Sequence, residues 1–169
     1  MPYVSRATVE RIVRCPFSVA HDYAAEFFRQ AEVSGIEVHV PLRDFVVGLR
    51  GRVRRPVKLF FAHHPDETED GRVHDALMVE WSAGTRLLPD FHGTVRLRIE
   101  TVDTTRIRLE GAWIVPFGLL GLVFNVVVGR RIAKSMMRDL LDRLGDALER
   151  REQTFRHEGH GAEGSGITA

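Results

Sequence analysis

The most informative part of the chain is residues 129–153, GRRIAKSMMRDLLDRLGDALERREQ. Apolar side chains recur in this stretch at the three- and four-residue spacing of a helix, and charged side chains fill most other positions. The apolar positions are Ile132, Ala133, Met136, Met137, Leu140, Leu141, Leu144, Ala147 and Leu148. A helix of this length extends about 37 Å, enough to cross a small domain. It therefore needs a broad apolar partner surface.

The segments before this helix have the patterns of strands, with apolar and polar residues alternating or with β-branched and aromatic residues enriched. The expected strands are residues 3–14, 36–42, 57–64, 73–83, 91–102 and 106–115. Residues 64–72, HPDETEDGR, are expected to form an acidic hairpin turn. Residues 18–32 form a short amphipathic helix in this interpretation, capped by Ser18.

The order of these elements predicts an α+β fold, in which a curved antiparallel sheet wraps around the long C-terminal helix. The length of 169 residues fits one domain with a sizeable core. We place that domain at residues 1–154. Residues 155–169 are rich in glycine and are expected to form a disordered tail.

The same order resembles the helix-grip fold of the START-like superfamily, also called SRPBCC. VERIVRCPFSVAHDYAAEFF, residues 9–28, looks like its first strand and helix. LEGAWIVPFGLLGLVFNVVVGRRIAKSMMRDLLDRLGDALE, residues 109–149, looks like its last strand and closing helix. The superfamily includes polyketide cyclase/dehydrase-like, pollen-allergen-like and lipid-transfer proteins. The resemblance implies an apolar cavity between helix and sheet, but no catalytic motif, because the superfamily has no universal one.

Composition and motifs exclude several classes of function. The net charge of +1 provides no overall field for nucleic acid, and no phosphate loop, dinucleotide motif or G-x-S-x-G elbow is present. Cys15 is the only cysteine, and the N-terminus lacks the apolar core of a signal peptide. We therefore expect a cytoplasmic protein that uses no cofactor and binds no nucleic acid.

The apolar run at residues 112–128 is shorter than the ~20 residues of a membrane-spanning helix, and it contains Pro116, Gly118 and Gly121. A strand, a turn and a buried helical segment account for it, without stable membrane insertion. Two interpretations of its centre stay open, a movable lid over a cavity and a rigid core plug. As a lid, it could make transient membrane contact. Its lid residues are Phe117, Leu119, Leu120 and Phe124.

Aromatic and methionine side chains are the best candidates for a ligand site. Aromatic rings supply rigid apolar walls, and methionine adapts to irregular shapes. The candidates are Phe61, Trp81, Phe91, Trp113, Phe117, Met136, Met137 and Leu140. The alternative is that these side chains fill a solid core.

Acid/base catalysis would require a polar side chain in the apolar interior, where burial shifts its pKa. Asp75, Asp90 and His39 are the candidates, although solvated carboxylates at strand ends explain the two aspartates equally simply. The His and acidic residues around residues 63–74 have ligand chemistry, but they are expected to be solvated in a turn, so no metal site is predicted.

The sequence therefore predicts the binding of a small hydrophobic molecule, either a lipid or an aromatic or polyketide-like compound, between helix and sheet. One alternative is a polyketide cyclase- or dehydratase-type enzyme that uses acid/base residues in the cavity. The other is a protein-interaction domain with a filled core. Whether the protein is an enzyme is left open by the sequence.

Overall fold

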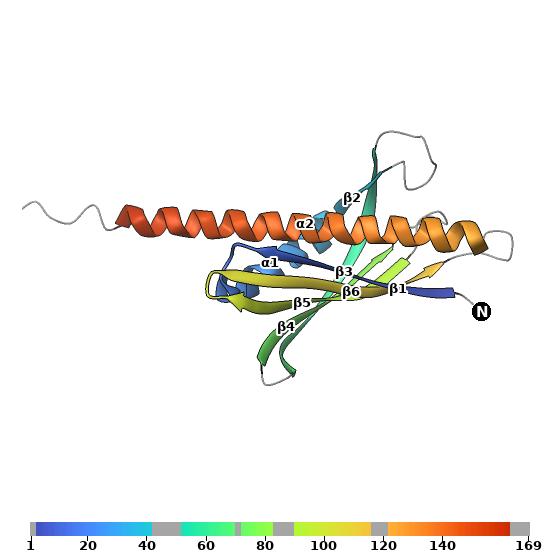
Figure 1. Ribbon diagram of the computed structural model, residues 1–169. Helices are drawn as coiled ribbons and strands as arrows, with labels where there is room; N and C mark the ends of the chain where they lie inside the picture. Colours follow the sequence, from blue (N-terminus) through green and yellow to red (C-terminus); the bar gives the residue numbers. More distant parts are fainter. Residues whose placement is uncertain (1–2, 42–51, 70–71, 83–89, 116–121, 163–169) are drawn as a thin grey trace, which may run out of the picture.

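The computed structural model describes residues 3–41, 52–69, 72–82, 90–115 and 122–162, and it confirms the α+β helix-grip fold (Figure 1). A six-stranded antiparallel sheet has the order β1-β6-β5-β4-β3-β2. The elements in chain order are β1 (Tyr3–Val13), α1 (Phe17–Ser34), β2 (Ile36–Pro41), β3 (Arg52–Glu69), β4 (Arg72–Ser82), β5 (Asp90–Thr101), β6 (Thr104–Val115) and α2 (Leu122–Ala162).

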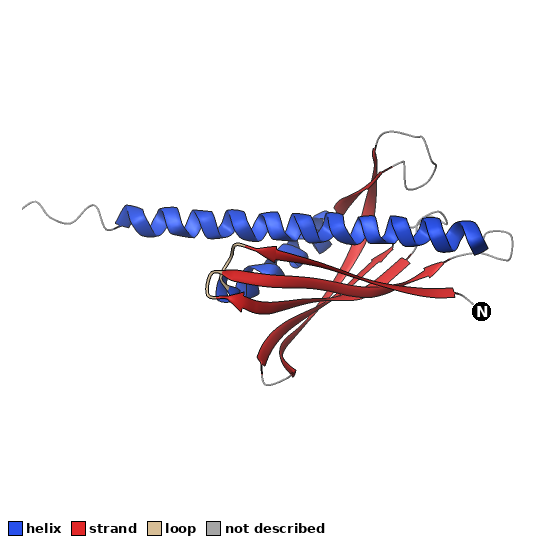
Figure 2. Ribbon diagram, viewed as in Figure 1, coloured by secondary structure: helices blue, strands red, loops and turns tan. Residues whose placement is uncertain are grey.

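The long helix α2 lies across one face of the sheet, where it contacts β1, β2 and β6 (Figure 2). Helix α1 contacts α2, β3 and β5, so both helices contribute to the same core. Alternate residues of each strand point into this core, as the period of two requires. Buried examples are Val9, Val13, Leu77, Val79, Val95, Leu97, Ile107 and Leu109. Opposite them, Met136, Met137, Leu140, Leu144 and Leu148 of α2 are also buried.

Helix α2 is longer than the expected 129–153, because it begins at Leu122 and continues through Ala162. Its last turns have local support: Arg156 pairs with Glu152 at 2.6 Å, and Arg151 lies 4.5 Å from the ring centre of Phe155. Residues 155–162, expected as part of a disordered tail, are therefore helical. In Figure 1 the C-terminal end of α2 extends beyond the edge of the sheet. Among the described residues, no helix has the length and apolarity needed to cross a membrane.

Strand β3 is also longer than expected, which corrects the interpretation of residues 64–72 as one turn. The pairing of β3 with β4 continues to Glu69 opposite Arg72, after an irregularity between His64 and Glu67. A bulge of this kind absorbs extra residues without ending the strand, and the pattern of side chains does not reveal it. Helix α1 ends as expected, at Gly35 with φ 75°, but Pro16 rather than Ser18 occupies its N-cap.

Arg11 of β1 fixes the position of α2 along the sheet. Its guanidinium donates to the Asp142 carbonyl oxygen at 2.8 Å and to the Asp146 carboxylate at 2.7 Å, and it pairs with Glu149 at 3.2 Å. Burial lowers the pKa of Arg11, but its bond to Asp146 and the surrounding carboxylates outweigh this and raise it. Gly145 provides the space, because a Cβ there would lie 2.7 Å from the guanidinium carbon.

Charged side chains cover much of the sheet face that points away from the helices. Arg106 bonds both Glu100 and Glu10, and Arg96 bonds Glu110. The bond from Arg106 holds the pKa of Glu100 below its usual range, while the two glutamates raise the pKa of Arg106. This face is therefore solvated, and the apolar surface of β5 and β6 is directed toward the helices.

Candidate ligand-binding site

Three aromatic residues form a row across the helix-facing side of the sheet. Trp81 of β4 is the register partner of Phe91 of β5, which is in turn the partner of Trp113 of β6. Directly opposed residues of antiparallel strands point to the same face. The Trp81 and Phe91 rings are stacked, with their centroids 3.8 Å apart and their planes inclined by 12°. All three side chains are buried. We refer to them as the aromatic row.

Two glycines make room for this arrangement. Gly93 and Gly111 are register partners on the same side of the sheet, and the ring of Phe91 lies over both. A Cβ on Gly111 would lie 2.7 Å from the His92 carbonyl oxygen and closer still to that ring. Phe91 therefore lies flat on the sheet, because any side chain at either position would displace its ring.

The core opposite the aromatic row is divided. Trp81, Phe91, Met136 and other apolar residues belong to one continuous cluster, whereas Trp113 and Ala133 form a second, separate cluster. The division falls between Phe91 and Trp113, although the two are neighbours in register. Among the described residues, the packing between helix and sheet is thus interrupted at this point.

The indole nitrogens of Trp81 and Trp113 are buried and have no hydrogen-bond partner. Most buried polar groups in proteins have such a partner. The buried hydroxyl of Thr105, for comparison, donates to the Cys15 carbonyl oxygen at 2.7 Å. The aromatic row therefore contains two N–H donors without an acceptor.

The structure brings six of the eight predicted ligand residues to this interface: Trp81, Phe91, Trp113, Met136, Met137 and Leu140. Their contact with a ligand stays a prediction. Phe61 lies in β3 opposite Val79, but its side chain is outside the described part of the chain. Phe117 and the other predicted lid residues up to residue 121 are outside it as well, as is the side chain of Phe124.

The three acid/base candidates lie on three different strands. Asp75 is opposite Leu97, Asp90 is opposite Ile114 and His39 is opposite Arg54, so no two of them are register partners. Their side chains are outside the described residues, and their role stays a prediction. No group of three or more His, Cys, Asp or Glu residues that could hold a metal ion occurs within the described ranges.

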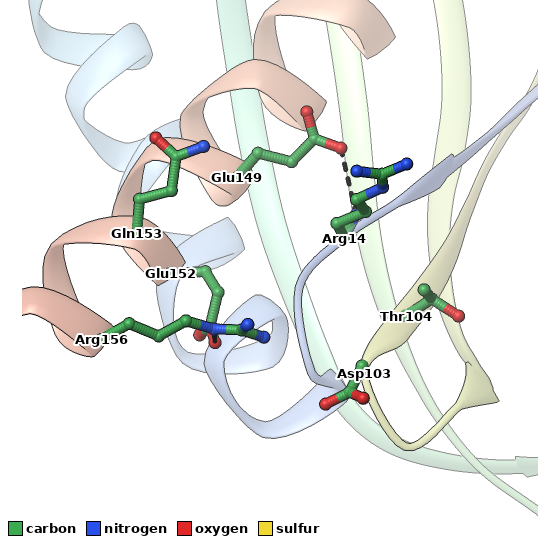
Figure 3. Close-up of a pocket in the computed structure, with 7 residues that line it drawn as sticks. All are labelled: Arg14, Asp103, Thr104, Glu149, Glu152, Gln153 and Arg156. Atoms are coloured by element: carbon green, nitrogen blue, oxygen red, sulfur yellow. Dashed lines mark hydrogen bonds and ion pairs between the residues drawn. The ribbon is translucent and has the colours of Figure 1, made fainter.

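A second, polar cleft of about 660 Å³ lies between the C-terminal half of α2 and the opposite end of the sheet (Figure 3). Its lining residues are Arg14, Asp103, Thr104, Glu149, Glu152, Gln153 and Arg156. Glu149 accepts a bond from the Arg14 main-chain N–H at 3.0 Å. The sequence did not indicate this cleft, because its residues come from three distant segments. Its mixed charges do not suit an apolar ligand.

Cys15 provides a test of burial at this end of the core. Burial raises the pKa of its thiol from 9.0 to about 12, with a further contribution from the Glu152 and Glu149 carboxylates. At pH 8 we expect the native thiol to react with a disulfide reagent about a thousandfold more slowly than in the urea-unfolded chain. The chain has no other thiol that could obscure the rate.

The same shift gives a pH dependence. Because the native thiol has the higher pKa, its contribution to stability is complete below pH 9 and is lost as the pH rises toward 12. Cys15→Ala should therefore show a smaller loss of stability over this window than the wild-type chain. Native and unfolded thiols reacting at equal rates would contradict the assignment of Cys15 to the core.

No protein-family model and no curated protein sequence matches the chain. The Zhui aromatase/cyclase from Streptomyces sp. R1128 is similar in structure, with a TM-score of 0.50 and 13% identity, over 93% of this chain and 99% of that chain. Norcoclaurine synthase from Thalictrum flavum, solved with dopamine and hydroxybenzaldehyde, gives a TM-score of 0.48 and 10% identity, over 87% of each chain. A protein from Thermus thermophilus gives 0.45 and 16% identity, over 89% and 98%. The first likeness confirms the fold that the sequence resemblance indicated, and at such identity it shows the fold alone.

Proposed function

We propose that the protein binds one small apolar molecule between α2 and the helix-facing side of the sheet. The observation that carries this proposal is the interruption of the core between Phe91 and Trp113. Protein interiors are normally packed as densely as organic crystals, so an interrupted contact between two buried aromatic neighbours favours a space that a ligand fills.

The side chains around this interruption support the same conclusion. Trp81 and Phe91 provide flat, rigid surfaces on the sheet, and Met136 and Met137 provide adaptable ones on the helix. This combination suits an aromatic or lipid-like molecule. The name of the aromatase/cyclase, a protein of the same fold, is compatible with such a ligand.

The described residues favour binding over catalysis. The only polar side chains buried among them are Thr105 and Glu152. Thr105 bonds the Cys15 carbonyl oxygen, and Glu152 pairs with Arg156. Neither belongs to the aromatic row. A cyclase or dehydratase would require an acid or base there, and Asp75, Asp90 and His39 are the residues proposed for that role.

Native mass spectrometry of the purified chain tests this proposal. We expect the folded chain to carry one small molecule that is released by denaturation, or, if it purifies empty, to take up one equivalent of a fatty acid, a sterol or a tricyclic aromatic probe. A chain that purifies empty and binds none of these would contradict the proposal.

A further inference from the structure

We infer that the molecule bound at the aromatic row carries a neutral hydrogen-bond acceptor, such as a ketone or ester carbonyl oxygen, that bonds the indole N–H of Trp81 or Trp113. This inference rests on the proposed function and specifies the chemistry of its ligand. It starts from the two buried indole nitrogens, whose side chains are only 3% and 0% exposed.

The two donors differ from the other buried nitrogens without a bond. Those are the Nε atoms of Arg98 and Arg108, and each belongs to a guanidinium group that interacts through other atoms. The indole nitrogen is the sole polar atom of a tryptophan side chain. For Trp81 and Trp113, a missing acceptor therefore leaves the whole polar capacity of the side chain unused.

The chemistry of the indole restricts what can complete it. An indole N–H donates and cannot accept, so a ligand group that only donates does not fit. A pure hydrocarbon fits the apolar walls but leaves both donors unsatisfied, which costs binding free energy. A carboxylate would need a cation to offset its desolvation, and no described residue of the aromatic row is cationic. A neutral carbonyl oxygen satisfies the donor without this cost.

The spacing of the donors indicates the scale of the ligand. Trp81 and Trp113 lie on strands separated by β5. Because neighbouring strands are ~4.8 Å apart, the two backbones are about 10 Å apart. A fused-ring ketone of two or three rings is therefore a suitable probe, since it can reach either donor while lying against Phe91.

The test compares ketones with hydrocarbons of nearly equal shape: 1-indanone with indane, 9-fluorenone with fluorene, and anthrone with 9,10-dihydroanthracene. Affinities are measured on the full chain by calorimetry. We expect each ketone that binds to do so at least about fivefold more tightly than its hydrocarbon, because a buried donor gains the partner it lacked.

The chain has only two tryptophans, so a ¹⁵N-labelled sample gives two indole N–H signals. Trp81→Phe and Trp113→Phe assign them and remove one donor each while keeping an aromatic ring. The ketone should move at least one indole proton signal downfield, whereas the hydrocarbon should not. At that position, Trp→Phe should reduce the affinity ratio to about one and leave hydrocarbon affinity unchanged, which also shows that the variant is folded.

Hydrocarbons that bind as tightly as their ketones would overturn the inference and leave the proposed function standing. A preference for ketones that persists in both Trp→Phe variants would overturn it as well. If no member of any pair binds and the chain purifies empty, the proposed function fails, and the inference fails with it.

Discussion

Leu140→Asp should lower the free energy of unfolding by about 4 kcal/mol or more, since it removes a buried apolar side chain and places a carboxylate where water cannot reach it. Leu140 lies in the centre of α2 and is 1% exposed. No described cation is bonded to it that could compensate the new charge. Urea denaturation followed by circular dichroism measures the loss.

Two further variants make this result interpretable. Leu140→Ala should cost about 2 to 5 kcal/mol through the cavity alone, so it reports on burial if Leu140→Asp does not fold. Gln153→Asp introduces the same charge at an exposed position of the same helix and should be nearly neutral. Equal stabilities for the Leu140 and Gln153 variants would contradict the packing of α2 against the sheet.

Gly111→Ala should cost about 3 kcal/mol, because the new methyl group would overlap the ring of Phe91 and the carbonyl oxygen of His92. Neither neighbour can move easily: Phe91 is fully buried, and the oxygen belongs to the main chain of β5. An alanine normally favours a strand no less than a glycine does, so the loss would come from packing.

A double-mutant cycle separates the two contacts. Phe91→Leu shortens the side chain over Gly111, so Gly111→Ala should cost at least about 1 kcal/mol less in that background than in the wild-type chain. Additive costs would show that Phe91 does not lie over Gly111, and the flat arrangement of the aromatic row would then be wrong.

Much of the fold follows from local patterns. The stripe from Ile132 to Leu148 and the alternation in β5 and β6 predicted which faces are buried, and the buried residues lie on those faces. The extents of elements were less predictable. The bulge after His64 and the helical turns after Gln153 depend on pairing and on side-chain bonds such as Glu152–Arg156, and composition alone does not show these.

The candidate site was predictable in its residue types but not in its geometry. Trp81, Phe91 and Trp113 were identified as aromatic candidates, but only the strand register aligns them in a row. The lack of an acceptor for the two indole nitrogens depends on every neighbouring side chain, so no spacing in the sequence could indicate it. Gly93 and Gly111 were missed for a similar reason, because the ring over them comes from a neighbouring position.

The most direct test of a ligand between α2 and the sheet is methyl NMR of ¹³C-labelled methionine. The chain has four methionines, at positions 1, 78, 136 and 137. Met136 and Met137 are fully buried between helix and sheet, whereas Met78 is 40% exposed and serves as an internal control. The sample is the chain with its extracted ligand or with the tightest-binding tricyclic probe. We predict that the Met136 and Met137 signals shift and show nuclear Overhauser contacts to the ligand, while Met78 is unchanged. A response confined to Met78 and Met1 at saturating ligand would contradict the account.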